Sequence, residues 1–213
     1  MIQLDDIKKA MPILKETWKE LGPDGRKRWQ WRDIWQSVFL ERETMISMLD
    51  IINNLKGVED MTVVDLGCEA GLISVILAQK FKHVIAIDLD ETSIERTHQT
   101  LYTFWDLGWD ISNIEVVHGD FNHYFKENKD SINAVYKVDS HASKIAFYRD
   151  HTYVLENTDM IIISEKEDFK EPIEEREEYL NKIRGIIKTY GFTIEEHQSL
   201  SYNRTPDVFI LRK

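Results

Sequence analysis

The chain has 213 residues, of which 42% are hydrophobic and 31% charged, a composition typical of a globular domain. No run approaches the roughly 18 consecutive apolar residues that cross a bilayer, and the N-terminal residues lack the apolar core of a secretion signal. Cys68 is the only cysteine, which excludes an internal disulfide and favours a cytoplasmic protein. The net charge of -11 disfavours a nucleic-acid partner, because phosphate binding requires a positive surface.

The N-terminal quarter of the chain differs in composition from the rest. Residues 1–57 have no strand pattern and are predicted to form a helical cap, ahead of a second domain at 58–213. Glycine and proline at 22–25 separate a first helix from a second at about 29–54. The segment holds four of the six tryptophans and a basic stretch, Lys8 to Arg32. We therefore expect it to cover the acceptor and to favour an anionic or aromatic one.

Strand and helix patterns alternate after residue 57. Apolar runs that end in turns predict strands, and the longer segments between them have helical spacing. The predicted strands are 61–67, 83–88, 113–120, 132–138, 159–164, 192–200 and 206–213. The last two lie close together in sequence and are expected to pair. This order predicts an α/β fold with a doubly wound, seven-stranded, mostly parallel sheet of the Rossmann-like kind.

The first strand runs directly into a glycine-containing turn, Val64-Asp65-Leu66-Gly67-Cys68-Glu69-Ala70-Gly71. Glycines at Gly67 and Gly71 permit a tight turn and close approach of a ligand to the backbone. Amides at the start of the following helix can receive polar ligand groups. Asp65 precedes the glycines, and a carboxylate there suits a ligand that carries an ammonium group.

Two further acids end the next two strands. Asp88, followed by Leu89, ends the second strand at a distance from the loop that suits a carboxylate accepting both ribose hydroxyls. Asp120 and Phe121 end the third strand. They can offer a carboxylate to an adenine amino group and an apolar face to the ring.

These segments resemble the three sequence motifs of the class I S-adenosylmethionine-dependent methyltransferases. The matching segments are VVDLGCEAGLIS, VIAIDLD and EVVHGDF, and the resemblance extends over about residues 61–213. It implies S-adenosylmethionine as cofactor and a methyltransferase fold in which the last strand inserts antiparallel. The cofactor-binding residues implied are Asp65, Gly67, Cys68 and Gly71 at the loop, Asp88 and Leu89 at the ribose, and Asp120 and Phe121 at the adenine. Glu69 departs from the family, which usually has glycine there, so its side chain must point away from the cofactor or narrow the pocket.

The end of the fourth strand is expected to face the methyl group. Lys137, Asp139, Ser140 and His141 lie there, and Asp139 and His141 are the preferred catalytic residues, because a neutral nucleophile needs a general base. An equally weighted alternative is that Asp139 or Ser140 caps the next helix. The stretch lacks the Asn/Asp-Pro-Pro motif of DNA amino-methyltransferases, which disfavours nucleobase amines.

A metal-dependent alternative rests on Asp139 and Glu165, which end neighbouring predicted strands. Their spacing is similar to that of catechol-type O-methyltransferases, in which two acids and an asparagine hold magnesium. Lys166 stands where the asparagine would help, so no metal is predicted.

The sequence thus predicts an S-adenosylmethionine-dependent methyltransferase acting on a small molecule or a protein side chain. One alternative is a non-catalytic cofactor-binding or scaffolding module, which Glu69 favours. Another is an NAD-dependent oxidoreductase, which the missing G-x-G-x-x-G motif disfavours.

Overall fold

The structure is a computed structural model that describes most of the chain. The described residues are 1–20, 49–138, 152–165, 181, 184–185, 187–198 and 207–213. Its helices are α1 (Leu4–Glu20), α4 (Leu72–Leu77), α5 (Glu91–Asp106), α6 (Phe121–Asn128) and α8 (Thr152–Asn157), with a short 3-10 helix at Lys129–Ser131. Its strands are β1 (Thr62–Leu66), β2 (His83–Asp88), β3 (Ile114–His118), β4 (Ala134–Val138), β5 (Met160–Glu165), β6 (Thr193–Gln198) and β7 (Asp207–Arg212).

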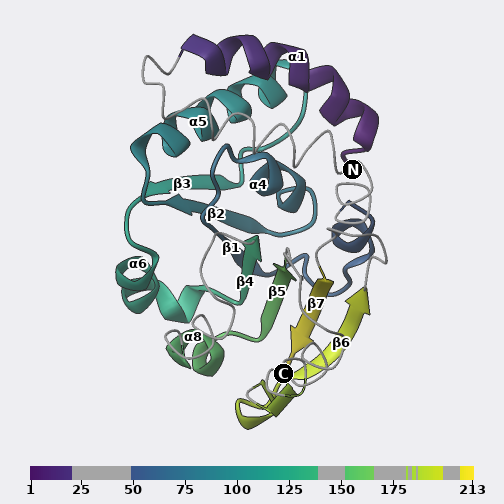
Figure 1. The fold of residues 1–213 in the computed structure, drawn as a ribbon, viewed down its shortest axis with the longest axis vertical. Helices are drawn as coiled ribbons and strands as arrows, with labels where there is room; N and C mark the ends of the chain where they lie inside the picture. The colour runs from purple at the N-terminus through teal and green to yellow at the C-terminus, as the bar shows by residue number, and fades with distance from the viewer. Residues whose placement is uncertain (21–48, 139–151, 166–180, 182–183, 186, 199–206) are drawn as a thin grey trace, which may run out of the picture. The chain divides into compact units, whose positions relative to one another are not determined.

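The strands form a seven-stranded sheet in the order β3-β2-β1-β4-β5-β7-β6 (Figure 1). The predicted α/β fold class is confirmed, and so is the pairing of the last two strands. By its contacts the chain divides into two compact units, Met1–Phe121 and Asn122–Lys213.

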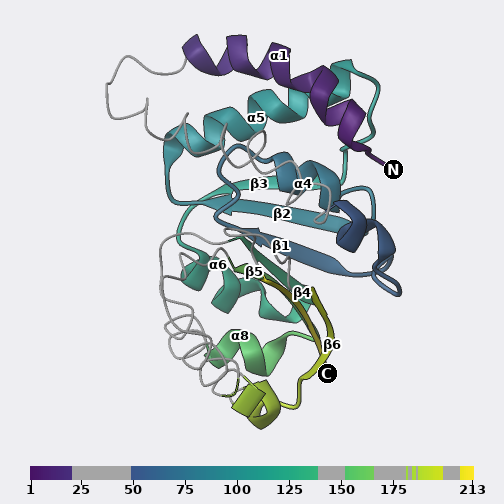
Figure 2. The same ribbon diagram turned by 45° about the vertical axis from the view of Figure 1, so that its right-hand side comes forward.

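The first unit is built on three parallel strands. β1 pairs with β2 and β2 with β3, so their carboxyl ends meet at one edge of the sheet. β1 and β2 have three and four consecutive buried residues, whereas β3, at the end of the sheet, has none. Helices α4 and α5 contact each other and both contact β2, so they cover one face (Figure 2).

Helix α1 packs on the outside of α5, as both ribbon views show (Figures 1 and 2). Its buried side chains recur at helical spacing: Ile7, Met11, Leu14 and Trp18 are each no more than 1% exposed. Of the predicted helix at 29–54, residues 49–54 are helical and the others lie outside the described residues. The predicted division into a cap at 1–57 and a domain at 58–213 remains a prediction.

The second unit contains the antiparallel end of the sheet. β4 and β5 are parallel, whereas β7 pairs antiparallel with both β5 and β6. Gly191, which follows the helical residues 187–189 and precedes β6, has φ +81°, the left-handed conformation that commonly ends a helix. In the part of the chain that the structure describes, no helix has the length and apolar character that crossing a membrane requires.

Candidate cofactor site

The turn after β1 has the backbone geometry that its glycines predict. Gly67 and Gly71 have φ values of +72° and +73°, in the left-handed region that favours glycine. A Cβ atom built on Gly67 would meet nothing within 4 Å, so the backbone there borders open space. A Cβ on Gly71 would instead lie 2.7 Å from Thr97 Cγ2. Gly67 thus leaves room for a ligand, while Gly71 permits close packing on α5.

Hydrogen bonds fasten this turn to β2. The backbone amides of Gly67 and Cys68 both donate to the carbonyl of Ile87, at 2.9 and 3.1 Å. The Gly71 amide donates to the Cys68 carbonyl at 2.7 Å. These amides are therefore used to hold the turn in shape, beside the end of the neighbouring strand.

Asp65 lies beneath the turn and is only 2% exposed. Ser74 in α4 donates its hydroxyl to Asp65 Oδ2 at 2.5 Å, and its backbone amide is a second hydrogen-bond donor to this carboxyl group. Burial, together with the charges of Glu69 and Asp88, raises the pKa of Asp65 to about 7, against the lowering effect of the hydrogen bonds from Ser74. Asp65 therefore ties β1 to the first turn of α4.

Asp88 ends β2 in a different environment. It is half-buried, and backbone amides hold both its carboxylate oxygens: Glu69 donates to Oδ2 at 3.0 Å and Asp90 to Oδ1 at 2.9 Å. Each carboxylate oxygen has about two lone pairs, so each can accept another hydrogen bond. The arrangement holds the carboxylate in one orientation without using its full capacity.

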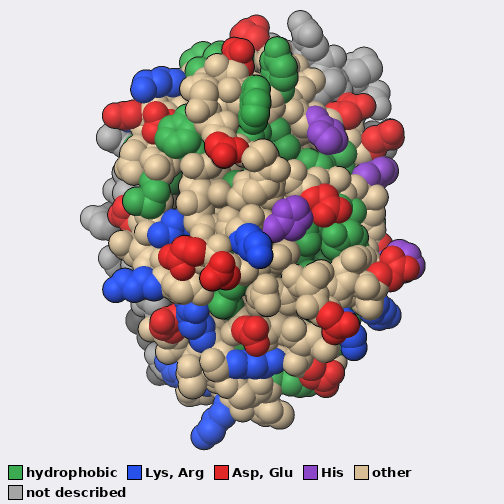
Figure 3. Space-filling model, turned by 180° about the vertical axis from the view of Figure 1, so that it is seen from behind, with side chains coloured by type: hydrophobic (Ala, Val, Ile, Leu, Met, Phe, Trp, Pro, Cys, Tyr) green, Lys and Arg blue, Asp and Glu red, His purple; other side chains and the backbone are tan. Residues whose placement is uncertain are grey.

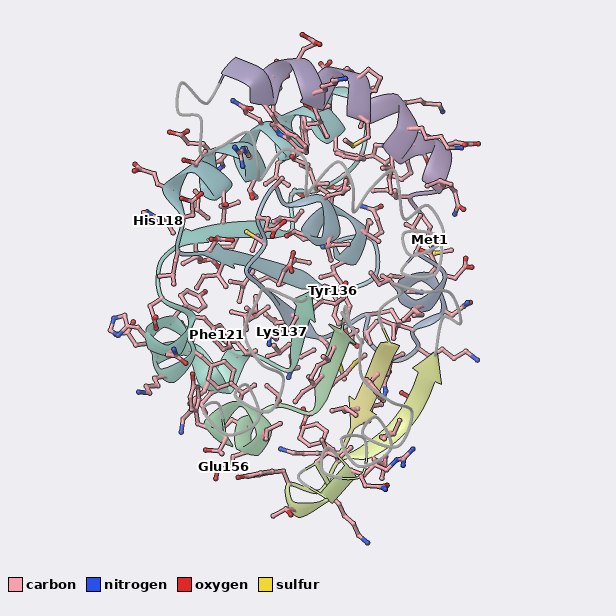
Figure 4. The ribbon with its side chains drawn as sticks, viewed as in Figure 1. Met1, His118, Phe121, Tyr136, Lys137 and Glu156 are labelled. Carbon is pink, nitrogen blue, oxygen red and sulfur yellow. The ribbon has the colours of Figure 1, made fainter. Side chains whose placement is uncertain are left out.

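The ends of β2 and β3 are also joined. His118 Nε2 lies 3.1 Å from the Leu89 carbonyl, and the Gly119 amide donates to the Asp88 carbonyl at 3.0 Å. The Leu89 side chain is 68% exposed, which leaves an apolar surface beside Asp88. Figure 4 shows His118 at the end of β3 and Phe121 at the start of α6.

Asp120 is exposed, whereas Phe121 is 6% exposed. Their placement after β3 puts a carboxylate and an aromatic ring beyond the third strand end. The carboxylate is open to solvent, while most of the ring is used in packing.

Cys68 packs inward rather than toward the open side of the turn. It belongs to a buried cluster with Ala86 and Ile94, and its Sγ lies 3.6 Å from Thr97 Oγ1. Burial and the charge of Asp65 raise the pKa of the thiol well above its usual value, so it remains protonated. Cys68 thus has the surroundings of a structural residue and not of a nucleophile.

The structure brings the predicted cofactor residues together at the carboxyl ends of three adjacent parallel strands, all in the first unit. The predicted catalytic residues Asp139 and His141 lie outside the described residues. Sequence reasoning missed Ser74 and Thr97, which no local pattern marks. Among the residues that the structure describes, no group of three or more His, Cys, Asp or Glu side chains is placed to hold a metal ion.

Comparison with known proteins relates this site to methyltransferases. Residues 63–157 match the family model described as a methyltransferase domain. No curated protein sequence matches the chain. An rRNA methylase from Streptococcus thermophilus is 20% identical, with a TM-score of 0.57, and the match covers 80% of this chain and 96% of that one. Precorrin-6y C5,15-methyltransferase from Geobacter metallireducens is 12% identical, with a TM-score of 0.55, and the match covers 78% of this chain and 86% of that one.

The matched segment begins in β1 and ends with α8, so it contains the turn and the three strand ends described above. Residues 63–157 are therefore similar to a methyltransferase domain, which indicates S-adenosylmethionine as the cofactor of this site. At these identities the solved structures show the shared fold and leave the methyl acceptor open.

Proposed function

We propose that this protein transfers a methyl group from S-adenosylmethionine to a small-molecule acceptor, with the cofactor bound across the carboxyl ends of β1, β2 and β3. The single observation that carries the proposal is the open turn at Gly67 beside the Asp88 carboxylate, whose two oxygens are each fixed by a backbone amide. That pairing provides space for the cofactor and a rigid acceptor of ribose hydroxyl groups.

Within this site, Asp88 accepts the ribose hydroxyls, and Leu89 supplies an apolar surface beside the ribose. Asp120 and Phe121, which follow β3, contact the adenine. Because Asp65 is buried against Ser74, we assign it to positioning the turn that borders the methionine part. The bound cofactor supplies an activated methyl group, and the protein supplies alignment and a dry site.

The charge distribution favours a small acceptor over a polyphosphate. The segments 67–71, 88–91 and 118–121 contain five acidic residues and no lysine or arginine. On the face drawn in Figure 3, the described lysines and arginines are interspersed with acids rather than gathered into a basic patch. A nucleic-acid partner requires such a patch to neutralise phosphates.

An RNA acceptor is the second candidate, favoured by the fold shared with an rRNA methylase. The two candidates separate in one experiment. The purified full chain would be incubated with methyl-labelled S-adenosylmethionine and, separately, with the metabolite, RNA and protein fractions of a cell extract. We expect label in the metabolite fraction, and reduced transfer by a matched Asp88→Ala preparation.

Label confined to RNA would overturn the small-molecule proposal and establish the second candidate. Label confined to protein would favour a protein side chain as acceptor. Calorimetry that detects no binding of S-adenosylhomocysteine to the wild-type chain would overturn the site itself.

For catalysis we propose Asp139 and His141 at the end of β4 as the general base pair, on their sequence position alone. Asp139→Asn and His141→Ala should lower turnover without changing affinity for S-adenosylhomocysteine.

We propose that no metal takes part in the reaction, so turnover should survive dialysis against EDTA. Activity that is lost to EDTA and restored by magnesium would favour the Asp139–Glu165 alternative.

The N-terminal segment is the proposed acceptor-side cap. The apolar face of α1, including Trp18, is buried in packing, so these side chains are not available to an acceptor. Trp29, Trp31 and Trp35 lie outside the described residues. Deleting 1–28 should therefore destabilise the first unit, and a variant such as Trp29→Ala is the better test of the cap.

A further inference from the structure

Thr97, in the second turn of α5, contacts the cofactor turn at three points. It is fully buried, and its hydroxyl donates to the Glu69 carbonyl at 3.0 Å. The same oxygen lies 3.6 Å from Cys68 Sγ. Since the single hydroxyl proton is directed to Glu69, the protonated Cys68 thiol is the donor in that second contact. The Thr97 methyl group also occupies the space next to Gly71.

The residue that Thr97 holds has an unusual conformation. Glu69 has φ +49°, and it is the one residue other than glycine with positive φ among those that the structure describes. A left-handed conformation costs an L-residue about 1–2 kcal/mol. Such a conformation persists only where the surrounding contacts enforce it.

Hydrogen bonds hold both of the peptide groups that flank the Glu69 Cα. Its carbonyl accepts from Thr97, and its amide donates to Asp88 Oδ2 at 3.0 Å. The left-handed conformation therefore links a helix residue on one side to the ribose carboxylate on the other. If the Glu69 carbonyl rotated away from Thr97, the neighbouring amide would be free to leave Asp88.

We propose that Thr97 is a positioning residue for cofactor binding. Its hydroxyl keeps Glu69 in the left-handed conformation, and Glu69 in turn orients the Asp88 carboxylate toward the ribose hydroxyls. The inference rests on the proposed assignment of Asp88 to the ribose.

Helix α5 offers a matched control. Thr103 is also buried, but its hydroxyl donates at 2.9 Å to the Gln99 carbonyl of its own helix. Thr97→Val and Thr103→Val thus remove the same atom from the same helix, and only the first removes a contact with the turn. Thr97→Ser retains the hydroxyl and serves as the conservative variant.

Isothermal calorimetry with S-adenosylhomocysteine on the full chain provides the test, with melting temperatures as the measure of folding. Loss of one hydrogen bond of about 1–1.5 kcal/mol predicts that Thr97→Val raises the dissociation constant about 10-fold. Thr97→Ser and Thr103→Val should stay within about 2-fold of wild type, although both valine variants lower the melting temperature to a similar extent. Thr97→Ala repeats the measurement if valine prevents folding.

A double-mutant cycle then tests the route through Asp88. Thr97→Val should add little to the loss already caused by Asp88→Ala, because both changes act on the same carboxylate. Fully additive losses, or an unchanged dissociation constant for Thr97→Val beside a lowered melting temperature, would overturn the positioning role while leaving the cofactor site intact. A wild-type chain that fails to bind S-adenosylhomocysteine would overturn the site and this inference together.

Discussion

Asp65 and Asp88 occupy equivalent places at or near the carboxyl ends of adjacent parallel strands, yet their surroundings differ. Asp65 is buried, accepts from Ser74, and has a pKa raised to about 7 by burial. Asp88 is half-buried, and both its oxygens accept from backbone amides. The difference separates two tasks: the carboxyl group on β1 holds the protein's own helix in place, and the carboxylate on β2 is available to a ligand.

The comparison predicts that removing Asp65 lowers the stability of the fold, whereas removing Asp88 lowers the affinity for the cofactor. Asp65→Ala should lower the free energy of unfolding by about 3 kcal/mol, because the Ser74 hydroxyl and amide are left buried without their acceptor. Chemical denaturation measures this loss, with Asp60→Ala as an exposed control. A loss no larger than that of the control would show that Asp65 does not support α4.

Asp88→Ala should instead act on affinity. Removing the proposed acceptor of the ribose hydroxyls is expected to weaken S-adenosylhomocysteine binding by about 1–3 kcal/mol. The loss of unfolding free energy should be smaller than for Asp65→Ala, because Asp88 is partly exposed to water. Calorimetry and denaturation on both variants test the contrast, which fails if Asp88→Ala destabilises the fold and leaves the affinity unchanged.

The sequence predicted this edge of the sheet well and the contacts behind it poorly. The spacing of apolar residues, the positions of the glycines and the acids at strand ends were enough to locate the turn and Asp88. Each of these signals depends only on a short stretch of the chain. The burial of Asp65 and the contact of Thr97 with Glu69 depend on how α4 and α5 pack on the strands. Thr97 lies 28 residues from Glu69 in sequence, so no local pattern marks it.

The raised pKa of Asp65 predicts a pH dependence of stability. The folded state holds the proton up to about pH 7, whereas the unfolded state releases it near the usual value of 3.8. The stabilising contribution is therefore complete below about pH 4 and is lost as the pH rises through about 7. The slope from this group should be on the order of 1 kcal/mol per pH unit, and Asp65→Asn should remove it. Denaturation series between pH 4 and 8 would refute the assignment if both proteins show the same slope.

Glu69 interacts with both acids, since its amide donates to Asp88 and its charge raises the pKa of Asp65. Its replacement should change the free energy of unfolding least. Glu69→Gly removes the cost of a left-handed L-residue and should raise the free energy of unfolding by about 1 kcal/mol. It also removes a negative charge that raises the pKa of Asp65, so the pH dependence should move to lower pH.

Glu69→Gln separates these two contributions. It keeps a side chain on the left-handed residue and removes only the charge, including the attraction that favours the protonated guanidinium of buried Arg96. Both variants lose that attraction, so the difference between them isolates the backbone term. Glu69→Gly should therefore be more stable than Glu69→Gln, while the two share the same shift in pH dependence. If Glu69→Gly is the less stable of the two, the left-handed conformation is not strained here, and the contacts of the side chain, rather than those of its backbone, keep the turn beside Asp88.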